Sequence, residues 1–291
     1  MAEVSEITVL SRLPVTIEIQ PWFRDHCFAG KMILPAVETL AVLANEVTKF
    51  RPDIEISKMY EAHFAKFLEI GPADHELEVM VEIAEHDLGQ ITAKLLSKFH
   101  KKAISRIVEH GRVTFSSHRA DLTPQADPTR FTLPQSAFKL SSQQVYRELV
   151  PFGKAYQNII GDMYLFEQGA WARLMAPALP STALGGGLGS PFPLDAAFHA
   201  ACVWGQRYAG FIPFPVGFSS RTISEFTEPG ATYETRVIPI EVKADELIFD
   251  LWIYTSQGEL FETVCGIKMR DVSGGRLKPP TWIKCSQNAI L

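Results

Sequence analysis

A histidine in an early loop is the first residue of this sequence that is placed to move a proton. His26 lies among Phe28, Met32 and Ile33. Because burial disfavours the imidazolium ion, we expect a histidine in these apolar surroundings to be neutral at pH 7. A neutral imidazole accepts a proton, so His26 is a candidate general base. Spacing alone favours the simpler interpretation that this histidine bonds a loop carbonyl.

A carboxyl group near the start of a later apolar segment is the second candidate. Asp195 precedes His199 by four residues, which places both side chains on one face of a helix. An aspartate in the first turn of a helix is also favourable for capping and for the helix dipole. Burial would raise the pKa of this carboxyl and the helix N-terminus would lower it, so both protonation states stay open at this point.

Each candidate belongs to one of two similar runs of predicted elements. In the first half, a β-branched stretch over 7–19 predicts two short strands with a turn at Pro14, and helical spacing predicts a helix from Pro35 to Phe50. The apolar run over 32–43 is interrupted by Glu38. Alternation then predicts four strands, at 58–68, 77–83, 91–99 and 107–115.

The second half repeats this order. A strand over 157–172 is followed by a glycine-rich loop, 185–189, and by a helix with Leu194, Phe198, Ala201 and Tyr208 on one stripe. We expect that loop to lie over a pocket mouth. Strands are then predicted at 222–226, 233–242, 247–255 and 260–269.

This repetition predicts a duplicated α+β unit, each unit an antiparallel sheet wrapped around one long helix. The strands lack intervening helices, which argues against a doubly wound parallel sheet. A polar, proline-containing stretch separates the halves. We therefore expect units over 1–117 and 141–291, with a linker over 118–140.

Composition excludes several classes of function. The chain has 28 Lys and Arg against 33 Asp and Glu, a formal net charge of −5, and 46% hydrophobic residues. This balance is typical of a folded globular chain and lacks the basic character of a general nucleic-acid binder. The four cysteines show no zinc-ligand spacing, and no apolar run is long enough to span a membrane. We expect a cytoplasmic protein that binds no metal. The remaining histidines are expected at the surface: His63, His75, His86, His100, His110 and His118.

Two motifs together resemble one known family. His26, Gly30 and Pro35 match the pattern His-x-x-x-Gly-x-x-x-x-Pro, and Asp195 and His199 match Asp-x-x-x-Gln/His after a Pro-Leu run. Trp22 and Asp25 before the histidine also fit. In this order, at the start of the helix in each half, the motifs resemble those of the polyketide synthase dehydratases.

The resemblance implies a double hot-dog fold and the dehydration of a β-hydroxyacyl thioester in polyketide or fatty-acid-like biosynthesis. His26 would be the base, Asp195 the acid, and His199 would position Asp195, while Gly30 and Pro35 would position substrate at the helix start. The substrate would be carried on the phosphopantetheine of an acyl carrier protein, with no other cofactor. Other synthase modules and a second copy of the chain are further partners that the resemblance implies.

One segment departs from the family pattern. Where the family has Tyr-Gly-Pro-x-Phe, this chain has Phe152, Gly153, Lys154, Ala155 and Tyr156. We expect Phe152, Gly153 and Tyr156 to help position substrate, without a hydroxyl at position 152. The departure favours a competing function, that of a catalytically silent acyl-binding or scaffolding module of a synthase. A product-template-like cyclase of the same fold also stays open and, less strongly, so does a thioesterase.

Overall fold

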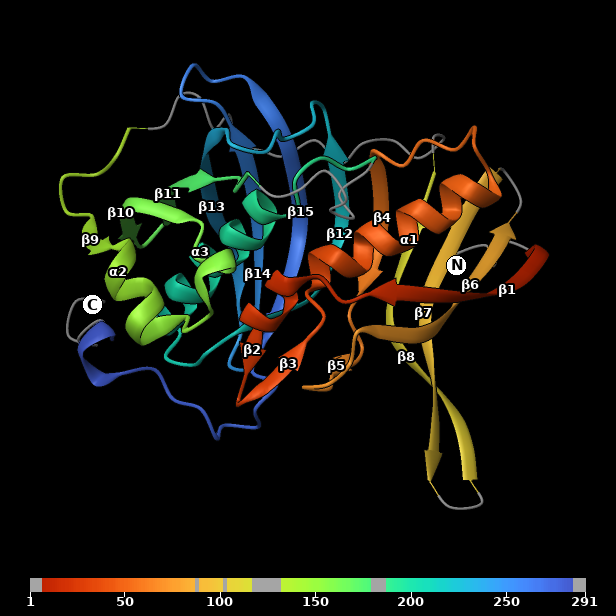
Figure 1. The fold of residues 1–291 in the computed structure, drawn as a ribbon. Helices are drawn as coiled ribbons and strands as arrows, with labels where there is room; N and C mark the ends of the chain where they lie inside the picture. The colour runs from red at the N-terminus through yellow and green to blue at the C-terminus, as the bar shows by residue number, and fades with distance from the viewer. Residues whose placement is uncertain (1–6, 87–88, 102–103, 117–131, 179–186, 285–291) are drawn as a thin grey trace.

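The computed structural model describes residues 7–86, 89–101, 104–116, 132–178 and 187–284. Each half of the chain combines one long helix with a run of strands (Figure 1). The first half contains, in chain order, β1 (Ile7–Glu18), the 3₁₀ helix η1 (Pro21–Asp25), β2 (Cys27–Phe28), β3 (Lys31–Ile33), α1 (Ala36–Phe50), β4 (Lys58–His63), β5 (Glu69–Ile70), β6 (Glu76–His86), β7 (Gln90–Lys101) and β8 (Ile104–Phe115).

The second half follows the same plan with a short helical segment before its sheet. It contains β9 (Phe138–Ser141), α2 (Ser142–Gln144), the π-helical turn η4 (Val145–Leu149), the 3₁₀ helix η5 (Lys154–Tyr156), β10 (Ile159–Phe166), β11 (Gly169–Met175), α3 (Phe192–Tyr208), β12 (Phe214–Ile223), β13 (Thr232–Val242), β14 (Glu246–Tyr254), β15 (Leu260–Arg270) and the 3₁₀ helix η6 (Thr281–Ile283). Strand β9 begins inside the segment expected as a linker.

One continuous antiparallel sheet joins the halves. Its strand order is β1-β6-β7-β8-β4-β12-β15-β14-β13-β11-β10-β9, and β2, β3 and β5 form a small separate sheet. The joint is made by β4 and β12, each the first strand after the long helix of its half. The two strand runs therefore meet in mirrored order, as expected for a duplicated unit.

A glycine at the joint lets the two central strands approach closely. Gly217 on β12 pairs with His63 on β4. A Cβ at position 217 would lie 2.2 Å from the carbonyl oxygen of Ala62, so no other residue fits there without moving the backbone.

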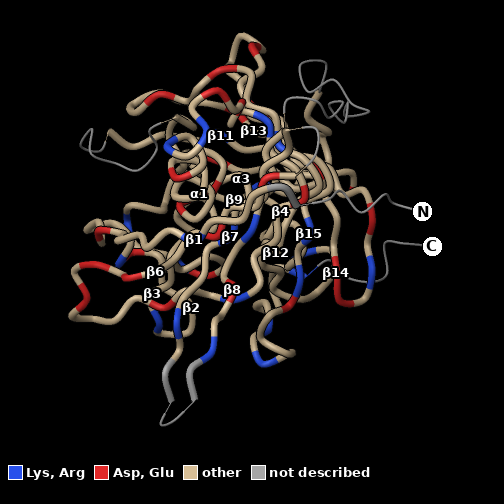
Figure 2. The backbone as a smooth tube through the Cα atoms, turned by 90° about the vertical axis from the view of Figure 1, so that its right-hand side faces the viewer, with Lys and Arg blue, Asp and Glu red and all other residues tan. Residues whose placement is uncertain are grey.

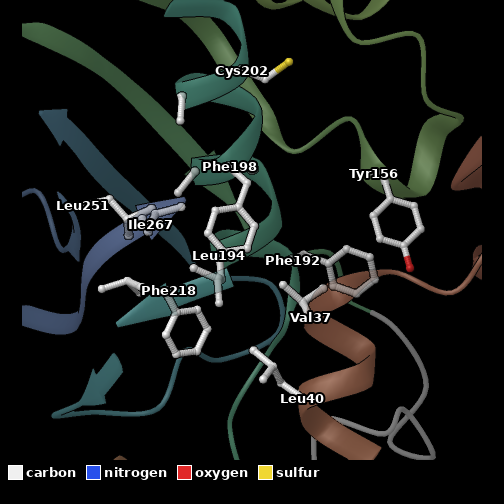
Figure 3. Packing of buried hydrophobic residues seen from close by; sticks show 14 of the residues in the cluster. Val37, Leu40, Tyr156, Phe192, Leu194, Phe198, Cys202, Phe218, Leu251 and Ile267 are labelled. Carbon is white, nitrogen blue, oxygen red and sulfur yellow. The ribbon is translucent and has the colours of Figure 1, made fainter. Parts of the chain in front are cut away.

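Both long helices lie inside the curve of the sheet. Helix α1 begins after Pro35, whose fixed φ suits the residue that precedes a helix, and it ends at Phe50, two residues before Pro52. Helix α3 is buried at every residue from Phe192 to Gln206. A helix that is covered all round is central to a fold. Figure 3 shows side chains of α1 close to those of α3, where the two helices meet.

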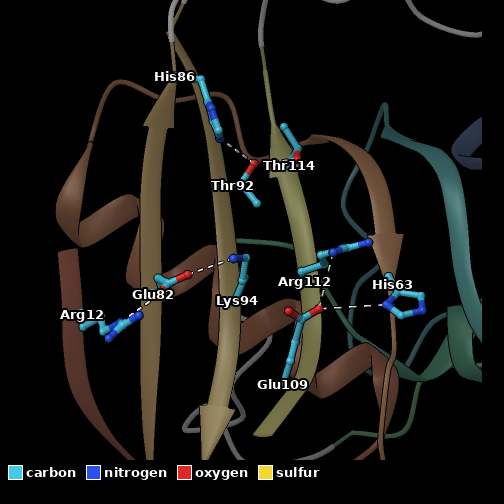
Figure 4. Close-up of polar contacts among 9 residues, drawn as sticks. All are labelled: Arg12, His63, Glu82, His86, Thr92, Lys94, Glu109, Arg112 and Thr114. Carbon is cyan, nitrogen blue, oxygen red and sulfur yellow. Dashed lines mark hydrogen bonds and ion pairs between the residues drawn. The ribbon is translucent and has the colours of Figure 1, made fainter. Parts of the chain in front are cut away.

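Charged residues lie mainly on the outer strands and loops, with both signs interspersed (Figure 2). On the outer face of the sheet, Glu82 on β6 accepts hydrogen bonds from Arg12 on β1, at 2.7 Å, and from Lys94 on β7, at 2.9 Å (Figure 4). The three residues are direct cross-strand neighbours, so this ladder supports the register of the sheet. No helix in the described part of the chain is long and apolar enough to cross a membrane.

Four predicted strands were wrong in their limits. The strand predicted over 58–68 ends at His63 as β4, and residues 64–68 are outside the sheet. The stretch over 7–19 forms one strand, and Pro14 is tolerated within it because β1 lies at the edge of the sheet. The predicted strand over 157–172 is two strands, β10 and β11, separated by a turn at 167–168. The strand predicted at 222–226 lies earlier, as β12, and residues after Ile223 leave the sheet.

Candidate functional site

A cavity of about 890 Å³ opens between the two halves. Aromatic and aliphatic side chains make up most of its wall, with a few polar groups among them, an arrangement that suits an apolar ligand with one polar end. Residues of both halves line it, among them His26, Phe28, Phe152, Asp195, Phe198 and His199.

His26 presents a basic nitrogen at this cavity. The residue ends η1, and its Nδ1 lies 3.2 Å from the carbonyl oxygen of Ile33. Because a carbonyl only accepts, Nδ1 carries the proton and Nε2 keeps its lone pair. Burial lowers the pKa of His26 to about 4, although the charge of Asp195 acts in the opposite direction. The ring is therefore neutral at pH 7, as the sequence predicted.

Phe152 separates and orients the two histidines of the site. Its ring stacks on His26 with centroids 4.3 Å apart and lies 5.1 Å from the ring of His199. Tyr156 meets the edge of His26 at 5.0 Å. The loop that carries both aromatic residues belongs to the second half, so this half fixes the position of the first half's histidine.

Asp25 ties that loop to η1. Its carbonyl oxygen accepts a hydrogen bond from the N–H of Gly153 at 2.7 Å, and its carboxylate Oδ2 accepts one from the N–H of Ala155 at 2.9 Å. These two bonds hold the residue before His26 against the residue after Phe152.

Asp195 lies in the first turn of α3, buried and one turn before His199. Nε2 of His199 is 3.0 Å from Oδ2 of Asp195, within ion-pair distance. Apart from this contact with His199, Oδ2 has no partner among the described residues. On the other side of the ring, Nδ1 of His199 lies 3.5 Å from the hydroxyl of Tyr146.

The charge state of Asp195 follows from these neighbours. Burial acts to raise its pKa, but the nearby His199 and, more weakly, His26 outweigh burial and hold the pKa below its usual value. The resting site thus contains a neutral base and an ionised carboxylate on the same cavity wall.

The family model for the "Polyketide synthase dehydratase N-terminal domain" matches residues 119–279, more than half of the chain. The chain belongs to the polyketide synthase dehydratase family. The match contains Asp195 and His199, while His26 lies outside it. No curated protein matches the chain by sequence.

Solved structures of dehydratase domains share its double hot-dog fold. The N-terminal dehydratase from the difficidin assembly line is 14% identical, with a TM-score of 0.68 over 90% of this chain and 93% of that one. A trans-AT polyketide synthase dehydratase domain from Brevibacillus brevis is 18% identical, with a TM-score of 0.67 over 91% and 96%. A bifunctional dehydratase-cyclase domain in ambruticin biosynthesis is 19% identical, with a TM-score of 0.66 over 89% and 91%. The predicted α+β double hot-dog fold is confirmed.

The glycine and proline of the first dehydratase motif shape the approach to α1. Gly30 follows Ala29 at the tip of the β2–β3 hairpin, where both residues have positive φ, and both line the cavity. Pro35 caps α1, and its carbonyl accepts from the N–H of Thr39 at 3.0 Å. Pro35 does not line the cavity, but Ala36, the first residue of the helix, does.

The segment that departs from the family pattern has its aromatic residues exchanged. Phenylalanine occupies position 152 and tyrosine position 156, so the hydroxyl lies four residues later than in the motif. Phe152 lines the cavity, whereas Tyr156 is fully buried behind the wall. The site keeps a tyrosine hydroxyl, but at a different place.

Two further expectations were wrong for the described residues. His110 is buried rather than solvated, bonded to Ser97 at 2.8 Å, and it lines the cavity. Of the glycine-rich loop, residues 185–186 lie outside the described part, and residues 187–189 do not line the cavity. A Cβ at Gly189 would instead meet Thr227.

Glu38 is a buried residue near the site that the sequence motifs did not indicate. This glutamate is on the first turn of α1, is only 1% exposed, and is close enough to Asp195 for their charges to interact. A lone carboxyl inside the mainly apolar run over 32–43 was the available signal. Within the described residues, no group of three or more His, Cys, Asp or Glu is arranged to hold a metal ion.

Proposed function

We propose that this chain is a hydro-lyase that removes water from a β-hydroxyacyl thioester to give the α,β-unsaturated thioester. The observation that carries the proposal is the placement of His26 and Asp195, one from each half, on the wall of a single apolar cavity. Family membership supports the same chemistry. A neutral imidazole and a carboxyl group are the two groups that this elimination requires.

In the proposed reaction, Nε2 of His26 takes the proton from the carbon next to the thioester carbonyl. Asp195 gives a proton to the β-hydroxyl group, the carbon–oxygen bond breaks, and water leaves. N–H groups at the start of α1 stabilise the negative charge that develops on the thioester oxygen. His199 positions the Asp195 carboxyl, and Phe152 holds the His26 ring by stacking.

The substrate in this proposal is delivered on the phosphopantetheine arm of an acyl carrier protein, and no other cofactor takes part. The acyl chain fills the apolar part of the cavity, beside aromatic residues such as Phe28 and Phe198. Carrier-protein binding, association with other synthase modules and dimerisation are parts of the proposal that binding and sedimentation measurements test.

Incubation with a series of 3-hydroxyacyl thioesters, on N-acetylcysteamine and on a carrier protein, tests the proposed function. Loss of one water by mass, with formation of the conjugated double bond, is the expected result. Release of free acid would indicate a thioesterase. Binding of the acylated carrier protein without turnover would indicate a silent module, and conversion of poly-β-keto chains alone would indicate a cyclase.

A further inference from the structure

A second buried carboxyl lies behind the wall of the cavity. Glu38 does not line the cavity, and its side chain is almost fully covered. The indole N–H of Trp22 is close enough to lower the pKa of Glu38, but within the described residues Oε2 receives no hydrogen bond of ordinary geometry. Buried carboxyl oxygens that lack a full hydrogen bond are rare in folded proteins, because the lost hydration is not replaced. Because burial of this carboxyl destabilises the fold, its presence here indicates a function.

Three other polar groups around Glu38 also lack a hydrogen bond of ordinary geometry within the described part of the chain. These are the indole N–H of Trp22, the hydroxyl of Tyr156 and Oδ2 of Asp195, whose neighbour is Nε2 of His199 at 3.0 Å. Figure 3 shows the Tyr156 hydroxyl directed toward the first turn of α1, and Tyr156 is near enough to feel the charges of both Glu38 and Asp195. The four groups form a buried polar cluster that joins the first turns of α1 and α3.

The cluster contains two carboxyl groups in different charge states. Burial and, after it, the charge of Asp195 raise the pKa of Glu38 to about 8, while the Trp22 N–H acts to lower it. Asp195 is held ionised chiefly by His199, which lowers its pKa. Double ionisation of two interacting buried carboxyls is unfavourable, so in the resting site they keep one proton between them. At neutral pH, Glu38 holds that proton.

We propose that Glu38 stores the proton that Asp195 gives to the departing hydroxyl group. This inference rests on the proposed function, because Asp195 as an acid needs a proton that its resting state does not carry. Glu38 acts through Asp195 and touches no reacting atom, so it is a positioning residue. The groups that interact with it directly are Trp22 from η1, Tyr156 from η5 and Asp195 from α3. Behind these, Asp25 interacts with Tyr156, and His26 and His199 interact with Asp195.

The proton balance of one cycle closes within these groups. Glu38 passes its proton to Asp195 as the substrate fills the cavity. His26 takes the proton from the α-carbon, Asp195 protonates the β-oxygen, and the carbon–oxygen bond breaks to give the double bond and water. Both carboxyls are then ionised and His26 is protonated. Return of the proton from His26 to Glu38 restores the starting state.

Infrared spectroscopy on the full chain tests the storage step without any turnover. The wild-type protein at pH 7 should show the carbonyl stretch of a protonated buried carboxyl, and the band should disappear near pH 8. Glu38→Gln should lack it. Glu46→Gln is the matched control, because Glu46 lies on the same helix but is ion-paired with Lys49, and it should keep the band. A band that persists in Glu38→Gln overturns the inference, as does its absence from the wild type.

The pH dependence of turnover tests delivery. Glu38→Gln should lower kcat at pH 7 by at least about tenfold with little change in KM, because a positioned acid contributes about 10²–10⁴-fold. In the pH profile of kcat, the basic limb of Glu38→Gln should lie at lower pH than that of the wild type, since only Asp195 remains to hold the proton. A merely structural role would leave that limb in place, and an unchanged profile overturns the inference. A wild-type protein that dehydrates nothing overturns the proposed function and delivery with it, while the infrared result still decides storage.

Discussion

Gly153 packs directly against the side chain of Asp25, at the point where the second half of the chain meets the first. A Cβ built on Gly153 would lie 2.4 Å from Cγ of Asp25. Contacts this short do not occur without displacement of one partner. The residues that follow Asp25 and precede Gly153 are His26 and Phe152, so this packing helps to set the distance between the His26 ring and the Phe152 ring that stacks on it.

Gly153→Ala should therefore lower activity more than it lowers the stability of the fold. We expect an overpacking cost of about 1–3 kcal/mol in the free energy of unfolding, together with a loss of kcat as Phe152 is pushed away from His26. Urea unfolding and turnover of a 3-hydroxyacyl thioester measure the two effects. Lys154→Ala, at an exposed neighbouring position, is the control and should change neither. Normal kcat in Gly153→Ala would show that the contact does not position the histidine.

Asp195→Asn keeps the shape of the acid and removes its proton. Turnover should fall by about 10²–10⁴-fold, the usual contribution of one positioned acid, while the circular dichroism spectrum stays unchanged. Asp162→Asn removes a carboxylate from a surface ion pair with Lys139 and should leave turnover unaffected. If the two variants were equally active, Asp195 would not be the acid.

The buried glutamate also predicts how stability depends on pH. The pKa of Glu38 is raised from its ordinary 4.5 to about 8. The stabilisation that accompanies a raised pKa is present below 4.5 and is lost as the pH rises through 8. The pKa of His26 is lowered from 6.5 to about 4, so its effect is confined to pH values below 6.5. Between pH 6.5 and 8, the titration of Glu38 therefore changes the free energy of unfolding, whereas that of His26 does not.

The free energy of unfolding should therefore fall between pH 6.5 and 8, by at most about 1.4 kcal/mol per pH unit for one proton. Glu38→Gln should lose this slope, and Glu46→Gln should keep it. Urea titrations of the three proteins at several pH values within this window measure it. Parallel curves for the wild type and Glu38→Gln would mean that Glu38 is ionised in the folded protein.

Local patterns in the sequence were sufficient to predict the two long helices and the residues at their starts. The helix predicted from Pro35 to Phe50 and the helix that carries Asp195 are both present, because apolar spacing, proline positions and burial agree there. The repeated order of elements was sufficient for the duplicated fold. These features depend on neighbours within a few turns.

Features that depend on contacts between the two halves could not be predicted from the sequence. The stacking of Phe152 on His26 joins residues more than a hundred positions apart, and nothing local indicates it. That β1 is an edge strand, and so tolerates Pro14, follows from the complete sheet order. Glu38 looked like an interruption of an apolar helix because the groups that interact with it electrostatically, Tyr156 and Asp195, come from the other half.

Removal of the proposed base is the most direct test of the claim that the two halves combine to act on one substrate. The measurement is conversion of a carrier-bound 3-hydroxyacyl thioester to the enoyl thioester by His26→Ala, followed by mass, beside the wild type and under conditions where both are folded. We predict that His26→Ala forms no product above background. Turnover by His26→Ala at the wild-type rate would contradict the account.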